Sequence, residues 1–207
     1  MKTAPDNPSP TRAYRQTARA EATAAREAQI LACFRELLAA RWFDEFTLQD
    51  VASGAGVTQQ TVIRKFGGKE GLLAALVEQI GSVMIERRDV AAGAIDTALD
   101  VLIDSYEADG PLVMRLLTQE QRFPMLSQFL NIGRREHRKW VACVFAPWLD
   151  CLSGAEHTLA LDALVAACDL YLWQLLRRDL GYSRARTLTV MRRLVTGILD
   201  GTEPEAS

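Results

Sequence analysis

Hydrophobic residues recur every three to four positions along nearly the whole chain after residue 20, which is the spacing of amphipathic helices. Ile30, Phe34, Leu37 and Leu38 form the first such stripe and predict a helix over residues 23–41. Sustained alternation of apolar and polar residues, the signature of half-buried strands, is not found. The pattern therefore predicts an all-α fold.

Later stripes predict further helices that are separated by Gly, Pro and Ser. The triplet Asp109-Gly110-Pro111 predicts a break, because Gly can end one helix and Pro can begin the next. Gly181 and Ser183 suit the end of one helix and the N-cap of another. The apolar stripes cover residues 70–88, 95–106, 112–122, 126–145, 159–176 and 188–198.

Between the first two long stripes lie two short units with helix-capping signals. Thr47 and Asp50, three residues apart, form a capping box, and Thr58 can cap the second unit. Gly54 and Gly56 are expected to supply the positive φ that a tight turn between crossing helices requires. This arrangement predicts a helix-turn-helix.

The second short unit has one inward face, which Val62 and Phe66 provide, and one polar face without any acidic residue. Amide side chains can pair with adenine edges, an aliphatic group can meet a thymine methyl group, and cations can bind phosphates. A solvated surface helix without a function would more often carry Glu. The pattern thus favours a DNA-recognition helix whose exposed residues are Gln59, Gln60, Thr61, Ile63, Arg64 and Lys65.

Residues 30–70 resemble the DNA-binding domain of TetR-family transcriptional regulators. The matching motifs are Phe43-Asp44, Thr47, Asp50-Val51-Ala52, Gly56-Val57-Thr58, Thr61 and Phe66-Gly67-Gly68-Lys69-Glu70. Four positions depart from the family pattern. Ile63 stands where Tyr is usual, Trp42 where Gly is usual, and Arg64 and Lys65 where His or Tyr is common. The resemblance implies an N-terminal three-helix helix-turn-helix domain over 23–69, followed by a helical ligand-binding and dimerisation domain over 70–207.

The same resemblance implies a sequence-specific DNA-binding regulator, usually a repressor that a small-molecule effector releases from a palindromic operator. It implies that Thr47 and Gln49 approach the phosphate backbone or a nearby base and that Lys69 binds a phosphate. The complete expected DNA-binding set is Thr47, Gln49, Thr58, Gln59, Gln60, Thr61, Ile63, Arg64, Lys65 and Lys69. A helical carrier of small molecules or lipids without DNA binding is the alternative.

The resemblance also implies a homodimer through residues 159–176 and 188–198, although each apolar face could equally belong to the core of one subunit. It implies an effector cavity as well, and aromatic residues at helical spacing are also typical of an ordinary core. The run 134–139 is either a solvated helix face or an anion-binding or salt-bridging surface. The residues expected around the effector are Tyr106, Met114, Phe123, Met125, Phe129, Trp140, Phe145 and Trp173.

The charge distribution adds to this picture more than the net charge does. The chain has 207 residues, 49% of them hydrophobic, with 24 basic and 26 acidic side chains. Residues 1–70 carry 10 basic and 8 acidic side chains, while 71–207 carry 14 and 18. Segment 1–22 is expected to be a flexible basic arm, either without a role or in contact with DNA.

Other classes of function lack candidate residues. Four cysteines without a CxxC pair are expected to be buried reduced thiols or, alternatively, redox-sensing or effector-contacting thiols, and two isolated histidines do not suggest a zinc site. We find no nucleophile and base set, so neither an enzyme nor a cofactor is expected. The absence of a signal peptide and of a membrane-spanning apolar run predicts a cytoplasmic protein without a membrane partner.

Overall fold

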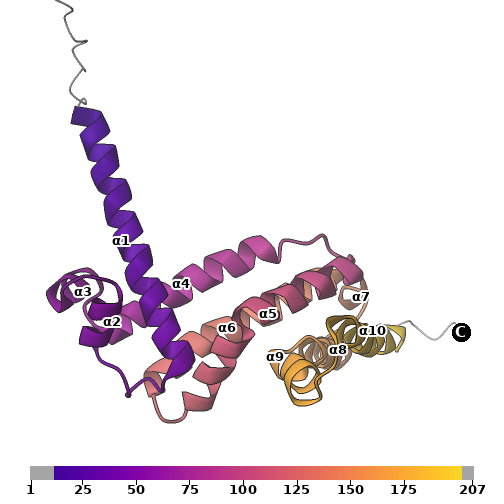
Figure 1. The fold of residues 1–207 in the computed structure, drawn as a ribbon. Helices are drawn as coiled ribbons and strands as arrows, with labels where there is room; N and C mark the ends of the chain where they lie inside the picture. The colour runs from indigo at the N-terminus through magenta and orange to yellow at the C-terminus, as the bar shows by residue number, and fades with distance from the viewer. Residues whose placement is uncertain (1–11, 202–207) are drawn as a thin grey trace, which may run out of the picture. The chain divides into compact units, whose positions relative to one another are not determined.

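The computed structural model describes residues 12–201, and it describes side chains from residue 19 onward. Within these residues the chain is helical and contains no β-strand, so the all-α prediction is confirmed (Figure 1). The elements are α1 (Arg12–Ala40), α2 (Leu48–Gly54), α3 (Gln59–Phe66), α4 (Lys69–Arg87), α5 (Ile95–Gln119), α6 (Pro124–Val144), α7 (Ala146–Leu149), α8 (Gly154–Ala167), α9 (Leu170–Trp173), the π-helical segment η1 (Gln174–Asp179) and α10 (Arg184–Asp200).

The chain divides into two units within α4, Met1–Leu76 and Val77–Ser207. In the first unit α2 packs against α1, and α3 packs against α2. Phe34 and Leu38 of α1, Val51 of α2 and Val62 of α3 are completely buried in its core. The three helices of the predicted helix-turn-helix domain are therefore present, and they pack around one apolar core.

Helix α1 begins at Arg12 and not near residue 23. Residues 12–22, which the sequence placed in a flexible arm, thus belong to the helix, and residues 1–11 lie outside the described part. Residues 12–41 contain no Gly or Pro and are rich in Ala, Arg, Glu and Gln, which have high helix propensity. Propensity therefore extends the helix beyond the point where its apolar stripe begins.

The second unit is built on contacts of α5 with α6, α9 and α10, and of α8 with α6 and α10. Its core is large because apolar residues from all these helices meet in one cluster. Completely buried members include Leu99, Leu102, Phe145, Leu164 and Met191.

The break predicted at Asp109-Gly110-Pro111 is wrong, because α5 runs through it and contains Pro111. The glycine at position 110 serves close packing. A Cβ atom added to Gly110 would lie 2.8 Å from Cζ3 of Trp173 and 3.2 Å from Cδ1 of Leu170. Tertiary packing against α9 therefore explains a glycine that the sequence suggested as a helix end.

The stripe 159–176 is not one continuous helix, since α8 ends at Ala167 and a turn follows at Cys168 and Asp169. The Asp169 carboxylate accepts a hydrogen bond of 2.8 Å from the backbone N–H of Tyr171, which caps α9. The Tyr106 hydroxyl donates to the Cys168 carbonyl across 2.8 Å and satisfies the end of α8. A local cap and a long-range hydrogen bond together create the break.

One helical run of the described residues, Gly154–Asp179, has the length and mean hydropathy (1.5) of a membrane span. The sequence had predicted no run of this kind. The core helix of a soluble protein can have the same length and hydropathy. In this run 44% of the most apolar 18-residue stretch is buried and a turn at 168–169 interrupts the helix, as in a pair of core helices.

The cysteines only partly follow the prediction. Cys33 and Cys168 are buried, whereas Cys143 and Cys151 are exposed, so burial was wrong for these two. All four are free thiols. The apolar sequence around Cys143 misled because its neighbours Val144 and Phe145 face the core while the thiol lies on the outer side of α6.

Candidate nucleic-acid interface

The caps that the sequence predicted around α2 and α3 are present. Thr47 accepts a hydrogen bond from the Asp50 N–H (3.2 Å), and the Asp50 carboxylate accepts one from the Thr47 N–H (2.7 Å), which completes the capping box. These hydrogen bonds to Thr47 hold the pKa of the Asp50 carboxyl below its usual value. Thr58 accepts from the Thr61 N–H at 3.2 Å and caps α3.

The turn between α2 and α3 depends on one glycine. Gly56 has φ +65°, a conformation that favours glycine, and the Val57 N–H next to it donates to the Ala52 carbonyl at 3.0 Å. Gly54, by contrast, is helical, and a Cβ atom there would lie 3.4 Å from Sγ of Cys33. The expectation of positive φ is thus confirmed for Gly56 and wrong for Gly54, where glycine allows α1 and α2 to approach closely.

Helix α3 exposes most of the face that the sequence assigned to DNA. Gln59, Gln60, Arg64 and Lys65 are exposed, while Thr61 and Ile63 are half-buried. Val62 is completely buried on the opposite side, and Phe66 is half-buried. The exposed face offers two amides and two cations, and no acidic residue lies on α3.

The two cations at the end of α3 differ in their surroundings. Lys65 forms an ion pair of 2.6 Å with Glu27 of α1, and both side chains are partly exposed. Arg64 is exposed as well, and it forms no such ion pair with any of the described residues. On α2, the exposed Gln49 donates to the Ser53 hydroxyl at 3.1 Å, and Thr47 is exposed beside it.

Lys69 occupies a different environment from the one that the resemblance implied. Its ammonium donates to the carbonyl of Phe43 and, at 2.7 Å, to that of Phe46. It also lies 4.3 Å and 3.8 Å from the centres of the same two rings. Burial among these groups lowers the pKa of Lys69. The structure gives Lys69 an internal role that the sequence did not suggest: it holds the linker between α1 and α2 against the start of α4.

In the second unit, three of the expected effector residues gather around one site. Tyr106 and Trp173 are in ring contact, with centroids 6.0 Å apart. The Arg88 guanidinium lies over the rings of Tyr106 and Trp140, which places Trp140 in the same neighbourhood. Phe145 and Met114 pack in or against the same core. Phe123, Met125 and Phe129 are half-buried on α6 or at its N-cap and are not members of that core.

Two of these aromatic residues have structural partners. The Tyr106 hydroxyl binds the Cys168 carbonyl, and burial raises the pKa of this phenol above its usual value. The completely buried Trp173 donates through Nε1 to the Glu107 carboxylate at 3.2 Å. Glu107 also accepts from Arg177 at 2.5 Å, so one carboxylate joins α5 to α9 and η1. Sequence periodicity did not single out Glu107, because it carries no sign of its tertiary partners.

The basic run 134–139 is mainly a surface with local ion pairs. Arg134 bonds to Glu120 at 2.6 Å, and Lys139 bonds to Glu136 at 2.7 Å. His137 differs from its neighbours because it is largely buried and stacks on Trp140 with a centroid distance of 6.2 Å. The run therefore contains one inward residue among solvated ones.

Comparisons with known proteins agree with the geometry of the first unit. Residues 30–76 match the sequence signature of bacterial regulatory proteins of the tetR family. The chain is 33% identical over 91 residues to the HTH-type transcriptional repressor LfrR of Mycolicibacterium smegmatis, covering 42% of this chain and 48% of that protein. It is 28% identical over 96 residues to the HTH-type transcriptional regulator AlkX of Mycobacterium tuberculosis, covering 43% and 46%.

The match thus spans about half the length of these relatives. Among solved structures, a tetR-family transcriptional regulator from Streptomyces coelicolor superposes with a TM-score of 0.64 at 17% identity. It covers 88% of this chain and 91% of that one. At this identity the likeness concerns the fold, and it extends over both units.

Proposed function

We propose that this chain is a TetR-family, sequence-specific DNA-binding transcriptional regulator, because residues 30–76 match the signature of that family. The observation that carries the proposal is the capped helix α3, whose exposed face presents Gln59, Gln60 and Arg64 without any acidic residue. A carrier that had lost DNA binding would have no reason to keep such a face. The chain is assigned no catalytic role, and a cytoplasmic location follows from this function.

A gel-shift assay against the DNA that flanks the chain's own coding sequence tests this proposal. Arg64→Ala is expected to weaken binding to all sequences and to reduce the slope of log K against log salt by about one. Gln59→Ala is expected to relax base preference, at a cost of about 1–3 kcal/mol of discrimination at one position. Failure to shift any palindromic fragment would exclude sequence-specific DNA binding.

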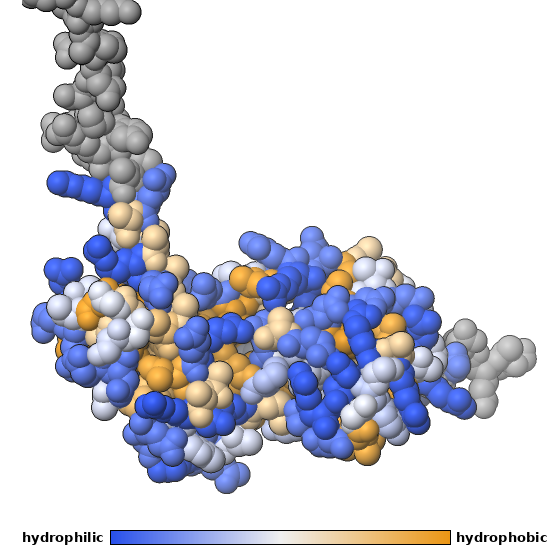
Figure 2. Space-filling view, viewed as in Figure 1, coloured by the Kyte–Doolittle hydropathy of each residue, from blue (hydrophilic) through white to orange (hydrophobic). Residues whose placement is uncertain are grey.

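The chain is proposed to act as a homodimer through the outward faces of α8 and α10. Most apolar residues of these helices serve the internal core, but Leu159 of α8 and Leu194 of α10 remain 72% and 43% exposed. On the face seen in Figure 2 the second unit is mainly hydrophilic, with apolar residues in separate patches. In such a dimer, two α3 helices about 34 Å apart would match the two halves of a palindromic operator.

Substitution of the exposed leucines tests the dimer without touching the core. Leu194→Glu combined with Leu159→Glu is expected to convert a dimer into a monomer of 23.0 kDa in light scattering after gel filtration. Ile85→Glu on α4, where Ile85 is 69% exposed, is the matched control and is expected to leave the dimer intact. A wild-type monomer, or equal effects of both variants, would contradict this interface.

Regulation is proposed to follow a population shift. The effector binds a form of the dimer in which the spacing of the two α3 helices does not match the operator half-sites, and the operator is therefore released. Helix α4 is the natural connection, because it begins in the first unit and ends in the second. Effector and operator are then expected to weaken each other's binding by the same factor. Independent simultaneous binding in titrations would exclude the mechanism.

The N-terminal extension of α1 is proposed to add affinity through DNA phosphates. Arginines at positions 12, 15, 19 and 26 recur at a spacing that brings these positions to one side of a helix. Deletion of residues 1–22 is expected to weaken binding to all sequences and to reduce its salt dependence. Unchanged affinity after this deletion would leave the extension without a role in DNA binding.

A further inference from the structure

The second unit contains a buried cation without a carboxylate partner. Arg88, directly after α4, is 7% exposed, and its Nε and Nη2 donate to the Ser105 hydroxyl at 3.2 Å and 3.1 Å. Its guanidinium lies 5.1 Å and 5.7 Å from the ring centres of Tyr106 and Trp140. Arginine is rarely buried without an acidic partner, because a charge removed from water needs compensation.

The acidic residue beside this cation is engaged elsewhere. Asp109 is near enough to raise the pKa of Arg88, although burial lowers that pKa more strongly. Its carboxylate is hydrogen-bonded to Nη1 of Arg87 at 3.4 Å. Among the described residues, Arg88 forms no ion pair with any carboxylate, so an anion from outside would complete its surroundings.

A second polar side chain lies near Arg88 and is likewise largely removed from solvent. His137 stacks on Trp140, and neither imidazole nitrogen has a partner at good hydrogen-bond geometry in the described part of the chain, although the Val165 backbone lies near the ring. Burial and the nearby charge of Arg88 lower the pKa of His137 to about 4, so the ring is neutral at pH 7. Buried polar groups are normally hydrogen-bonded, which makes this pair of unused nitrogens an exception that a ligand could explain.

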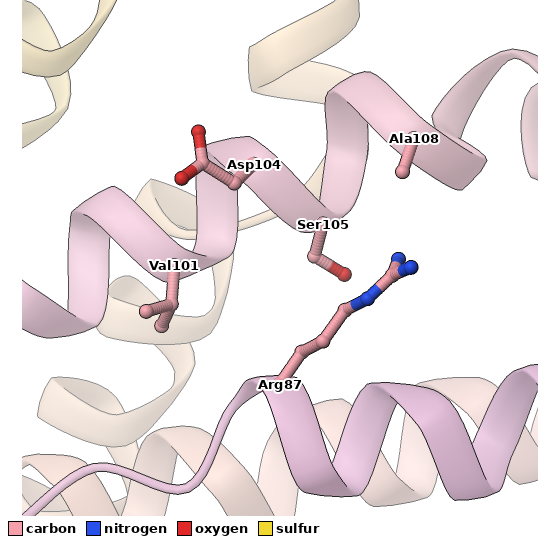
Figure 3. Close-up of a pocket in the computed structure, with 5 residues that line it drawn as sticks. All are labelled: Arg87, Val101, Asp104, Ser105 and Ala108. Atoms are coloured by element: carbon pink, nitrogen blue, oxygen red, sulfur yellow. The ribbon is translucent and has the colours of Figure 1, made fainter.

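A groove on the surface shares one residue, Ser105, with the contacts of Arg88. It is lined by Arg87 at the end of α4 and by Val101, Asp104, Ser105 and Ala108 of α5. Figure 3 shows the Arg87 side chain reaching from α4 towards Ser105 and Ala108. Ser105 lines the groove, and its hydroxyl oxygen accepts from Arg88, so this side chain connects the groove to the buried guanidinium behind it.

We propose that this groove binds a small organic monocarboxylate with an apolar body, and that this compound class contains the effector. The carboxylate meets Ser105 and Arg88, with Arg87 at the groove as a second cation. Val101 and Ala108 provide apolar contact for the body, and Asp104 in the same groove is paired with Arg184 at 2.8 Å, so its charge is compensated. The assignment as an effector rests on the proposed function, but the binding site itself does not.

Calorimetric titration of the full chain without DNA tests the site. The probes are octanoate and 3-phenylpropionate, the uncharged octanamide and 3-phenylpropionamide, and inorganic phosphate. At least one carboxylate is expected to bind once per chain and about tenfold or more tightly than its amide, while phosphate, which lacks an apolar body, does not bind. Equal binding of acid and amide, no binding of either carboxylate, or binding of phosphate would overturn the proposal.

Arg88→Met removes the cation and keeps a side chain of similar length. The matched control is Arg134→Gln, which removes a surface cation of α6 that is paired with Glu120. Arg88→Met is expected to abolish the preference for acid over amide while retaining a cooperative melting transition. Arg134→Gln is expected to retain the preference. A folded Arg88→Met protein that still prefers the acid would refute the role of Arg88.

Gel shifts of the same variants separate the two proposals. If the chain binds carboxylates but no DNA, the regulator function fails and the site stands. If it binds DNA but neither carboxylate, the site fails and the regulator function stands. If both bind, the carboxylate is expected to weaken the DNA complex of the wild-type chain and to leave that of Arg88→Met unchanged.

Discussion

Replacement of Lys69 by Met distinguishes a structural role from a phosphate contact. The structure places the ammonium on the carbonyls of Phe43 and Phe46 and over their rings. A hydrogen bond from a charged donor contributes about 1.5–3 kcal/mol and a cation–π contact about 0.5–1 kcal/mol. Because the site is only partly buried, water replaces some of these contacts, and we expect a total loss of about 2–3 kcal/mol.

A loss of this size lowers the melting temperature of a chain of this length by about 5–10 °C. Thermal denaturation followed by circular dichroism measures this shift, and gel shifts over a salt series measure the number of phosphate contacts. Lys69→Met is expected to lower the melting temperature and to leave the salt slope unchanged at a temperature where the variant is folded. Arg64→Met, which changes an exposed cation, is expected to leave the melting temperature unchanged and to reduce the salt slope.

The internal role of Lys69 is refuted if Lys69→Met melts like the wild type and shows a smaller salt slope. That result would assign its ammonium to a DNA phosphate, as the family resemblance implied. If Lys69→Met lowers both the melting temperature of the DNA-free protein and the salt slope of DNA binding, the ammonium stabilises the linker and also contacts a phosphate.

Three further predictions concern mainly the second unit. Its folded state holds the pKa of His137 at about 4, below the ordinary value of 6.5, so the unfolded chain binds the proton first and stability falls as the pH drops from 6.5 towards 4. Chemical denaturation is expected to show a loss of about 2 kcal/mol between pH 7 and pH 5 that is absent in His137→Phe, and identical pH profiles would contradict it. Gly110→Ala brings a Cβ atom against Trp173, so it is expected to lower stability by about 1–2 kcal/mol despite the better helix propensity of Ala, and an unchanged or higher melting temperature would show that the ring can move aside. A thiol reagent is expected to label Cys143 and Cys151 quickly in the folded chain and Cys33 and Cys168 only after denaturation, because these two thiols are buried and burial also raises the pKa of Cys168 to about 12. Four fast thiols, or none, in mass spectrometry would refute the burial pattern.

The sequence alone determined the features of this protein that depend on neighbours within a few residues. Apolar residues at helical spacing gave the all-α class, and Thr47 with Asp50 and Thr58 with Thr61 gave caps that the structure contains. Gly56 was identified correctly because a tight turn needs positive φ at that position. These signals are local, so they can be recognised before any tertiary contact is known.

Only the tertiary structure decided what distant residues do to one another. Gly110 looked like a helix end until Trp173 was seen packed against it, and Lys69 looked like a free cation until its ammonium was found on the carbonyls of Phe43 and Phe46. Arg88 was only the last residue of the predicted helical stripe 70–88, yet in the structure it is a buried cation of the second unit. Burial and partners of a side chain depend on which segments the fold brings beside it, and spacing along the chain carries no information about that.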